Sequence, residues 1–525
     1  MLGFSNYISS IEMRIIDRNS AGLGVSSLML MENAGRSVAD LVEKVLGDVK
    51  GKDIVVFAGA GGNAGDGLTA ARHLASRGAR VRVYLLTKPS ELRGEETVIE
   101  YQAVEHMDLS IEIIQVREEK DIPDSIRADA VIDALLGIGV KGRVRSLYAK
   151  AIEAINSSQG VKVAVDVPSG LDPDTGKELG PVVRADYTVT FHKPKKGLIG
   201  REEYTGRLVV ASIGIPREAE IYVGPGDLEF RLTRRDWRSH KGSNGRVLVI
   251  GGSEDYTGAP ALAAQAAYYA GVDLVVIAAP RRAADIIASF TPTMIAVRLE
   301  GHDNLHPDHL SKLRSLMEKA DAIALGMGLG LSKETGEAVR AVVEEAIRMG
   351  KKLVVDADGL KHLAGHERLL SRSMILTPHA GELRILFGVE PPPPERVIER
   401  ARLVEELARR HGNVTILFKG PVDVISDGET TRLNKTGSPL MAVGGTGDLL
   451  AGLAAAFLAQ GLEPVHAASL AAFVNGVAGG LAYREYGDHA STVEILAKIP
   501  EVFRNPMEAF KKSLVYSRLP LERIG

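Results

Sequence analysis

The clearest chemical signal in this sequence is a run of special residues in its last third. The run Asn434–Pro439 is followed by Gly444–Asp448, which directly precedes an apolar helical stretch. Backbone N–H groups at a helix N-terminus attract anions, so Gly445–Gly447 could stabilise a transferring phosphoryl group. The carboxylate of Asp448 would then lie where it can accept a proton from a hydroxyl. This combination predicts phosphoryl transfer to a hydroxyl with Asp448 as the general base.

Further polar or glycine-rich segments of the second half follow predicted strands, where α/β sheets bind ligands. They are Gly251-Gly252-Ser253, Tyr256–Pro260, Gly326–Gly330, Asp356–Gly359, Thr377–Glu382 and Phe418–Pro421. Within them, His379 could donate a hydrogen bond to a ligand. The sequence contains no G-x-x-x-x-G-K-[ST] run, which excludes a P-loop nucleotide site.

Three histidines in the middle of the chain have a spacing that could suggest a metal site: His302, His306 and His309. Pro307 and Asp308 are interleaved with them, which is typical of a solvated loop that caps the next helix. We therefore expect a loop here and no metal.

In the first half, the glycine-rich turn Gly59–Gly67 follows a predicted strand and precedes a helix predicted over residues 68–76. Such a turn exposes backbone N–H groups to a phosphate. It contains an approximate match to the G-x-G-x-x-A dinucleotide fingerprint. That fingerprint also requires an acidic residue for the ribose near the end of the next strand, which here ends in Thr87-Lys88. Hydride transfer is therefore not favoured, and a turn that serves geometry alone remains the alternative.

Two aspartates come at the ends of later strands of this half. Asp133 is followed by the loop Gly137–Arg143, whose amides and basic side chains could contact a phosphate, and Asp166 follows the next strand. Each alone could be an ordinary cap, but with Gly59–Gly67 they predict one shared pocket at the carboxyl edge of a sheet. The basic residues after the following strand are expected to form a solvated turn: Lys193, Lys195 and Lys196.

These segments are positioned by short β-branched runs that alternate with helical patterns, which is typical of parallel sheets covered on both faces. The first series of predicted strands covers residues 53–58, 81–86, 111–116, 130–135, 161–165, 187–191 and 207–211. The second covers residues 246–250, 274–278, 322–325, 352–355, 374–376, 414–418 and 422–426. Between them, Gly214–Asp236 is rich in proline, glycine and charge. We therefore expect two α/β domains, over residues 1–224 and 225–525.

The composition of the chain excludes several classes of partner and of site. Its 525 residues carry a net charge of −3, so no bulk basic field attracts nucleic acid or anionic lipid. The absence of cysteine excludes disulfides, zinc–thiolate sites and a thiol nucleophile. The apolar stretch 449–459, taken as the longest near the C-terminal end, is about half a membrane span, and no signal peptide is seen. We expect a soluble, cytoplasmic protein without a nucleic-acid or membrane partner.

The first half resembles the NAD(P)HX epimerase family over about residues 5–215. The resemblance is carried by Met31–Gly35, by Gly61–Gly67 in place of a G-N-N-G-G-D-G motif, by Asp133–Arg143 and by Asp166–Gly170. It implies a Rossmann-like domain that binds a hydrated nicotinamide dinucleotide, and a K⁺ ion held by Asn63, Asp133 and Ser169. Asp166 is then a catalytic candidate. The implied substrate-binding residues are Gly62, Asn63, Ala64, Gly65, Asp66, Gly137, Ile138, Gly139, Val140, Lys141, Gly142, Arg143 and Asp166. Gly62 departs from the family motif, because it removes one side-chain amide.

The second half resembles the ribokinase-like family over about residues 228–505 and, within it, the ADP- or ATP-dependent NAD(P)HX dehydratases. The residues that carry this resemblance are His240-Lys241-Gly242, Tyr256–Pro260, Thr377–Glu382 and Gly444–Asp448. It implies a substrate near Ala259, Gly328, His379 and Asp448. It places ADP, with Mg²⁺ bridging its phosphates, on Lys419, Gly420, Pro421, Val422 and Asp423, with Gly447 beside the phosphates.

Together these resemblances imply a Rossmann-like three-layer α/β/α domain followed by a ribokinase-like α/β domain in one bifunctional repair enzyme. The first domain would interconvert the R and S epimers of hydrated NADH and NADPH (NADHX and NADPHX). The second would use ADP to phosphorylate the hydroxyl of the S form and then eliminate phosphate. Phosphorylation helps because water has a pKa of about 15.7, whereas the second pKa of a phosphate is about 6. We also expect a homo-oligomer.

Two alternatives stay open. The second domain could be a small-molecule kinase of the vitamin type, with the first as its dinucleotide-binding module. Alternatively, the first domain could bind its ligand without catalysing a reaction.

Overall fold

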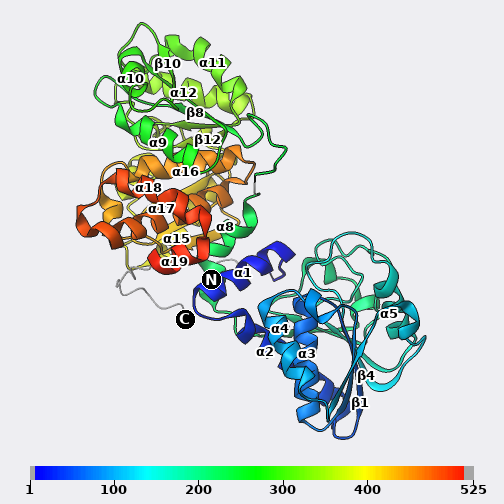
Figure 1. Cartoon of the computed structure of the whole chain (residues 1–525). Helices are drawn as coiled ribbons and strands as arrows, with labels where there is room; N and C mark the ends of the chain where they lie inside the picture. Colours follow the sequence, from blue (N-terminus) through cyan, green and yellow to red (C-terminus); the bar gives the residue numbers. More distant parts are fainter. Residues whose placement is uncertain (1–5, 234, 514–525) are drawn as a thin grey trace. The chain divides into compact units, whose positions relative to one another are not determined.

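The structure is a computed structural model that describes residues 6–233 and 235–513 (Figure 1). It divides into two compact units, of which the first ends at Ala219 and the second begins at Glu220. This division lies a few residues before the boundary expected at Gly224. Each unit contains its own sheet.

The sheet of the first unit has seven parallel strands in the order β3-β2-β1-β4-β5-β6-β7. The strands are β1 Asp53–Ala58, β2 Arg80–Leu85, β3 Ile111–Gln115, β4 Arg127–Ala134, β5 Gln159–Val165, β6 Tyr187–Phe191 and β7 Arg207–Ala211. The strand order reverses between β1 and β4, and the carboxyl ends of strands at such a reversal form the usual ligand crevice of an open α/β sheet.

Helices cover both faces of this sheet. Alternate strand residues such as Ile54 and Ile132 pack with α1 to α4, whereas Val55 and Val131 pack with α5, so the unit has three layers. The helices are α1 Ser10–Gly22, α2 Ser27–Leu46, α3 Gly62–Ser76, α4 Glu95–Glu105, α5 Ser146–Ser157 and the short α6 Glu202–Thr205. The expected Rossmann-like arrangement of this half is therefore present.

The second unit has a nine-stranded sheet in the order β10-β9-β8-β11-β12-β13-β14-β15-β16. The strands are β8 Arg246–Ile250, β9 Leu274–Pro280, β10 Ile295–Leu299, β11 Ala322–Leu325, β12 Lys352–Val355, β13 Met374–Leu376, β14 Thr415–Phe418, β15 Asp423–Ser426 and β16 Thr431–Asn434. Strands β8 to β14 run parallel, and β15 and β16 form an antiparallel edge. The sequence analysis missed β10 and β16, the two edge strands.

The helices of the second unit again lie on both faces of the sheet. They are α8 Pro225–Arg231, α9 Gly258–Tyr269, α10 Arg281–Ile287, α11 Leu310–Lys319, α12 Lys333–Arg348, α13 Asp358–His362, α14 Ala380–Phe387, α15 Val397–Arg410, α16 Thr446–Ala459, α17 Pro464–Tyr486, α18 Thr492–Arg504 and α19 Pro506–Ser513. A short helix, α7 Arg217–Ile221, spans the division between the units.

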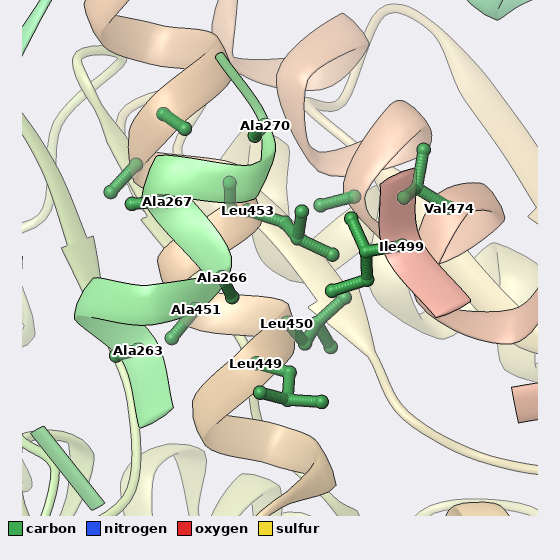
Figure 2. Packing of buried hydrophobic residues seen from close by; sticks show 14 of the residues in the cluster. Ala263, Ala266, Ala267, Ala270, Leu449, Leu450, Ala451, Leu453, Val474 and Ile499 are labelled. Carbon is green, nitrogen blue, oxygen red and sulfur yellow. The ribbon is translucent and has the colours of Figure 1, made fainter. Parts of the chain in front are cut away.

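Small side chains let the central helices of the second unit pack closely (Figure 2). A Cβ atom at Gly452 of α16 would lie 2.0 Å from the Ala263 carbonyl oxygen of α9, so only glycine fits there. Leu453 on α16 and Ile499 on α18 belong to the same buried cluster. This packing fixes α16, whose N-terminus carries Gly445–Gly447.

Helix α17 is also part of this core. Within the described residues, the span Pro464–His489 is long and apolar enough to cross a membrane, but 94% of its most apolar window is buried inside the protein. The sequence analysis had taken residues 449–459 as the longest apolar stretch. It overlooked α17 because the many alanines and glycines of this helix are only weakly hydrophobic, although the helix is buried.

The segment after the division belongs to the second unit. The Val223 amide donates to the Leu433 carbonyl over 2.8 Å, and Arg432 Nη2 lies 3.0 Å from Asp227 Oδ2. A cut at Gly224 would therefore separate Val223 from Leu433, with which it pairs in the second unit.

Candidate active sites

A cavity of about 810 Å³ opens in the second unit between the turn after β14 and the N-terminus of α16. Its lining residues are His379, Lys419, Gly420, Pro421, Asp423, Lys435, Thr436, Gly437, Ser438, Pro439, Met441, Ala442, Val443, Gly444, Gly445, Thr446, Gly447, Leu450, Ala472, Asn475 and Gly476. This volume is within the range of cavities that hold small-molecule ligands.

The turn predicted to bind the nucleotide lines this cavity with four of its five residues. Val422 is the exception, because its side chain is buried in the core. Asp423 shapes the turn: its Oδ1 accepts from the Gly420 amide over 2.9 Å, and its Oδ2 accepts from Asn434 Nδ2 over 2.9 Å. Burial raises the pKa of Asp423 to about 6. Arg400 packs beneath the turn, and its Nη2 donates to the Lys419 carbonyl over 3.3 Å.

The sequence analysis gave no role to the opposite wall of the cavity, which includes Thr436 and Gly476. A Cβ atom at Gly476 would lie 2.2 Å from Thr436 Oγ1, so the helix can approach this loop only through glycine. Thr436 Oγ1 also donates to Asn434 Oδ1 over 2.8 Å. The unusual run Asn434–Pro439 was the available signal for this wall.

A cation and two carboxylates meet beside the cavity. Lys419 follows β14, Asp356 follows β12, and Glu382 lies in α14. Lys419 Nζ lies 3.0 Å from Asp356 Oδ1 and 3.7 Å from Glu382 Oε2. Burial lowers the pKa of Lys419, but these carboxylates more than compensate and leave it above its ordinary value. Thr377 Oγ1 donates to Asp356 Oδ1 over 2.7 Å. The site thus holds a fixed, protonated lysine.

Asp448 lies in the first turn of α16, next to this charge cluster. Burial and then the Asp356 carboxylate raise the pKa of Asp448 to about 7, against the opposing effect of Lys419. A carboxylate with this pKa can exchange a proton near neutral pH. Gly447 lines the cavity, and Asp448 does not.

The turn before α16 brings backbone N–H groups close to these charges. Gly445 has φ +94°, which favours glycine, and the Gly444 carbonyl accepts from Thr492 Oγ1 over 2.6 Å. The Cβ position that Gly447 lacks is 3.5 Å from Lys419 Nζ and 3.6 Å from Asp356 Oδ2. The turn that was predicted to bind an anion therefore lies beside the partly buried ammonium group of Lys419.

The other residues predicted to hold the substrate fall into two groups. Gly328 and Ala259 lie together, since a Cβ atom at Gly328 would be 3.6 Å from that of Ala259 and 2.6 Å from that of Tyr256. Neither lines the cavity, whereas His379 does. His379 Nδ1 accepts from the Gly381 amide over 3.0 Å and so caps α14, and its Nε2 lies 3.4 Å from Glu382 Oε1.

In the first unit, the three residues predicted to hold K⁺ meet around Leu136. Ser169 Oγ donates to Asp133 Oδ1 over 2.6 Å, and the Ser169 amide donates to Asp133 Oδ2 over 2.8 Å. Asn63 Nδ2 donates to the Leu136 carbonyl over 3.2 Å, and the Leu136 amide donates to Ser169 Oγ over 2.9 Å. Burial raises the pKa of Asp133 to about 6. Carboxylate, hydroxyl, carbonyl and amide oxygens are the ligand types that a hard cation takes.

Asp166 is held by the last two residues of β6 and by Lys195, which follows that strand. Its Oδ1 accepts from Thr190 Oγ1 and from the Phe191 amide, each over 3.1 Å, and from Lys195 Nζ. Asp166 itself has φ +63°, a left-handed conformation that is rare outside glycine. All three donors contact Oδ1, and among the described residues none of these hydrogen bonds uses Oδ2.

The prediction that Lys195 belongs to a solvated turn is wrong. Its side chain is fully buried, and its Nζ contacts the Asp166 carboxylate, Thr190 Oγ1 and the Phe191 carbonyl. The segment before α1 covers this loop, since Ile8 exchanges backbone hydrogen bonds with Pro194 and Lys196. Nothing in the local sequence distinguishes Lys195 from its exposed neighbours.

Two further carboxyl groups surround this ion pair. Burial and the Asp166 charge raise the pKa of Asp17 to about 7, against the opposing effect of Lys195. Burial, followed by the charges of Asp166 and Asp17, also raises the pKa of Asp66 well above its ordinary value. Asp17 Oδ1 is buried without a hydrogen-bond partner in the part of the chain that the structure describes. The sequence analysis missed Asp17, which is one of several polar positions of the amphipathic helix α1.

The glycine-rich segment after β1 is helical earlier than predicted. Helix α3 begins at Gly62, and a Cβ atom at Gly65 would lie 2.4 Å from Met31 Cε. Gly65 is therefore needed for helix packing, and the same residue contributes to the predicted ligand turn only through its backbone. Lys141 and Arg143 in the loop after β4 are exposed, as a phosphate contact requires.

Comparisons with known proteins agree with the two units. A family model described as NAD(P)H-hydrate dehydratase matches residues 247–501, and one described as YjeF-related protein N-terminus matches residues 27–197. A solved ADP/ATP-dependent NAD(P)H-hydrate dehydratase from Bacillus subtilis is 27% identical, with 55% of this chain and 98% of that chain covered and a TM-score of 0.45.

Relatives are matched over essentially their whole length. A bifunctional NAD(P)H-hydrate repair enzyme of Hyperthermus butylicus is 52% identical, with 100% of this chain and 97% of the relative covered. One of Pyrobaculum aerophilum is 47% identical, with 95% and 98% covered. The chain therefore belongs to the family of bifunctional NAD(P)H-hydrate repair enzymes.

Proposed function

We propose that this chain repairs hydrated NADH and NADPH in two reactions, one in each unit. The first unit interconverts the R and S hydrates, and the second dehydrates the S hydrate at the expense of a nucleotide. The observation that carries the second assignment is Asp448, a carboxyl with a pKa of about 7, in the turn of backbone amides that opens α16. Membership of the family supports both reactions.

In the dehydration, the nucleotide occupies the cavity between Lys419–Asp423 and Lys435–Gly437. Asp448 accepts the proton of the substrate hydroxyl while the oxygen of that hydroxyl attacks the terminal phosphoryl group. The bond from phosphorus to the bridging oxygen breaks, and with ADP the product is AMP. Lys419 and the Gly445–Gly447 amides stabilise the charge on the transferring group.

Elimination then completes the reaction. The bond from carbon to phosphate oxygen breaks with its electron pair, and the neighbouring ring carbon loses a proton, which restores the double bond of the reduced nicotinamide. Phosphate is a far better leaving group than hydroxide, which explains why a fold built for phosphoryl transfer serves a dehydratase.

ADP is the proposed donor, and ATP is the competing one. Mg²⁺ would enter with the phosphates and supply positive charge to them. Asp356 is the residue that would hold it, since its Oδ2 lies 3.6 Å from the Cβ position that Gly447 lacks. Ala259 and Gly328 remain the proposed substrate wall, together with Nε2 of His379.

In the epimerisation, Asp166 is the proposed acid–base residue, because Lys195 and two further donors hold its Oδ1 and, among the described residues, none of these hydrogen bonds uses Oδ2. Asp17 can exchange a proton near neutral pH because burial raises its pKa to about 7, and burial also raises the pKa of Asp66 well above its ordinary value. The substrate would lie against residues 62–66 and 137–143. K⁺ held by Asn63, Asp133 and Ser169 would supply a positive charge that offsets the buried Asp133 carboxylate.

Absorbance at the reduced nicotinamide band tests the dehydratase. Adding ADP to the full chain with hydrated NADH should restore that absorbance, and ATP and each hydrated dinucleotide are compared in parallel. A small-molecule kinase would instead accumulate a phosphorylated product without restoring the band. For the epimerase, pure R hydrate should give the S form with no nucleotide present, whereas a module that only binds its ligand would leave R unchanged. Homo-oligomerisation and a cytoplasmic location stay predictions.

A further inference from the structure

A group of metal-ligating side chains lies on the loop that joins β10 to α11. His302 Nε2 is 3.0 Å from Asp308 Oδ2, and His306 Nδ1 is 3.1 Å from the same oxygen. The rings of His302 and His306 are stacked, with centroids 3.6 Å apart and planes at 18°. The three ligand atoms all lie within 4.8 Å of one another. The sequence analysis had expected only a solvated loop here.

The third histidine of the loop is an anchor and not a ligand. His309 Nε2 contacts the Glu300 carbonyl over 3.1 Å, and its Nδ1 accepts from the His306 amide over 3.1 Å. Both ring nitrogens are therefore used, and His309 is buried. Because the ring of His309 holds the His306 amide, the loop is fixed at the position where His302 and His306 meet.

Without a cation, the contacts of His306 are in conflict. Its Nδ1 accepts from the Asp308 amide over 3.2 Å, so that nitrogen needs a free lone pair. The Asp308 carboxylate oxygen at 3.1 Å from the same nitrogen would instead need a proton on it. One ring nitrogen cannot meet both demands. A cation that takes the lone pair would satisfy the nitrogen and the carboxylate oxygen, and the amide of the exposed Asp308 would then turn to water.

We propose that His302, His306 and Asp308 bind one divalent first-row transition-metal ion such as Zn²⁺. Two imidazole nitrogens with one carboxylate suit Zn²⁺, whereas Mg²⁺ takes oxygen ligands. Bonds of about 2.0–2.2 Å place the ligands of a tetrahedral ion roughly 3.3–3.5 Å apart, whereas the observed distances are 3.0 and 3.1 Å. Binding therefore needs a small opening of the loop and a turn of one of the two stacked rings, so that both lone pairs meet at the ion. His302 and Asp308 are exposed, so water can occupy the fourth position.

The ion would fix a loop that is joined to the second unit through Leu305, whose side chain is buried in the core of that unit. The Leu305 carbonyl accepts from Thr335 Oγ1 over 3.0 Å, at the start of α12. None of the three ligands belongs to either proposed active site. The proposal therefore stands or falls independently of the repair reaction.

The test uses the full chain without a polyhistidine tag, stripped of metal with a chelator and free of nucleotide. Co²⁺ is titrated as the probe, because four-coordinate Co²⁺ has strong visible absorption, and Zn²⁺ is then added in competition. We expect about one equivalent of Co²⁺ to bind and Zn²⁺ to displace it. The variants His302→Ala and Asp308→Asn should weaken binding at least about tenfold.

His489→Ala is the matched control, because that histidine is exposed and lies outside the cluster. It should bind Co²⁺ as the parent does. All variants are checked for an unchanged thermal unfolding temperature in chelator, which their exposed positions predict. Absence of saturable Co²⁺ binding to the parent would overturn the proposal. Parent-like binding in His302→Ala and Asp308→Asn would place the ion elsewhere and would overturn it equally.

Discussion

Replacing Asp448 by asparagine removes the proposed base while keeping the size of the side chain. General-base contributions are typically about 10²–10⁴-fold, so dehydration of the S hydrate should fall by at least about two orders of magnitude. The residual rate comes from Lys419 and the amides of the α16 turn, which the substitution leaves in place. Epimerisation in the other unit should be unchanged.

The same substitution has a defined effect on stability. The pKa of Asp448 is about 7 in the folded protein against 3.8 for an unperturbed aspartate, so the folded state binds the proton more tightly than the unfolded state. This stabilisation is complete below the ordinary pKa and is lost as pH rises through about 7. At 1.36 kcal/mol per pKa unit, the loss is at most about 4 kcal/mol. Asparagine does not titrate, so the variant should match or exceed the parent in unfolding temperature at pH 8, with a difference that narrows toward pH 5.

The assay measures recovery of absorbance from hydrated NADH with ADP, from pH 5 to 9. In the parent the rate should rise with pH and level off above about 7, because only the ionised Asp448 accepts a proton. Asp448→Asn should be almost inactive at every pH, with epimerisation as the internal control. Full dehydratase activity in this variant would refute the role of Asp448 and reduce Gly445–Gly447 to a simple turn.

Three other changes test the remaining assignments. Asp133→Ala should lower epimerisation and its dependence on K⁺, because it removes the acceptor of three buried hydrogen bonds. Dehydration of pure S hydrate should stay intact, and unchanged epimerisation with unchanged K⁺ dependence would contradict the cation site. Lys195→Gln should slow epimerisation and move its pH profile upward, since Lys195 is the cation that opposes the raised pKa of Asp17; a parent-like profile would show that the lysine serves packing alone. A chain divided between Ala219 and Glu220 should give two folded, active fragments. Division at Gly224 should destabilise the second fragment, because it loses the Val223 contact with Leu433. Aggregation of both fragments in the first design would mean that the units share a core.

Local chemistry in the sequence was enough to predict most of the strands and the turns at their ends. The runs of β-branched residues located the central strands, because a strand buried on both faces is apolar along its whole length. The same reasoning missed Ile295–Leu299 and Thr431–Asn434, which lie at the two edges of a sheet and carry exposed or polar residues. Gly444–Asp448 was predicted as a helix start with an acidic residue, and helix α16 begins there, because a helix N-terminus is encoded by neighbouring residues.

Only the tertiary structure decided which charged groups face one another. Lys419 meets Asp356 across 63 positions of sequence, and Lys195 meets Asp166 across 29, because the parallel strands that precede these residues end at the same edge of their sheet. The sequence around Lys195 is basic and polar, so it predicted a solvated turn; burial came from Ile8, which lies far away in the chain. The pKa values near 7 of Asp17 and Asp448 have the same origin, since desolvation depends on every element that packs around a carboxyl and on no single motif.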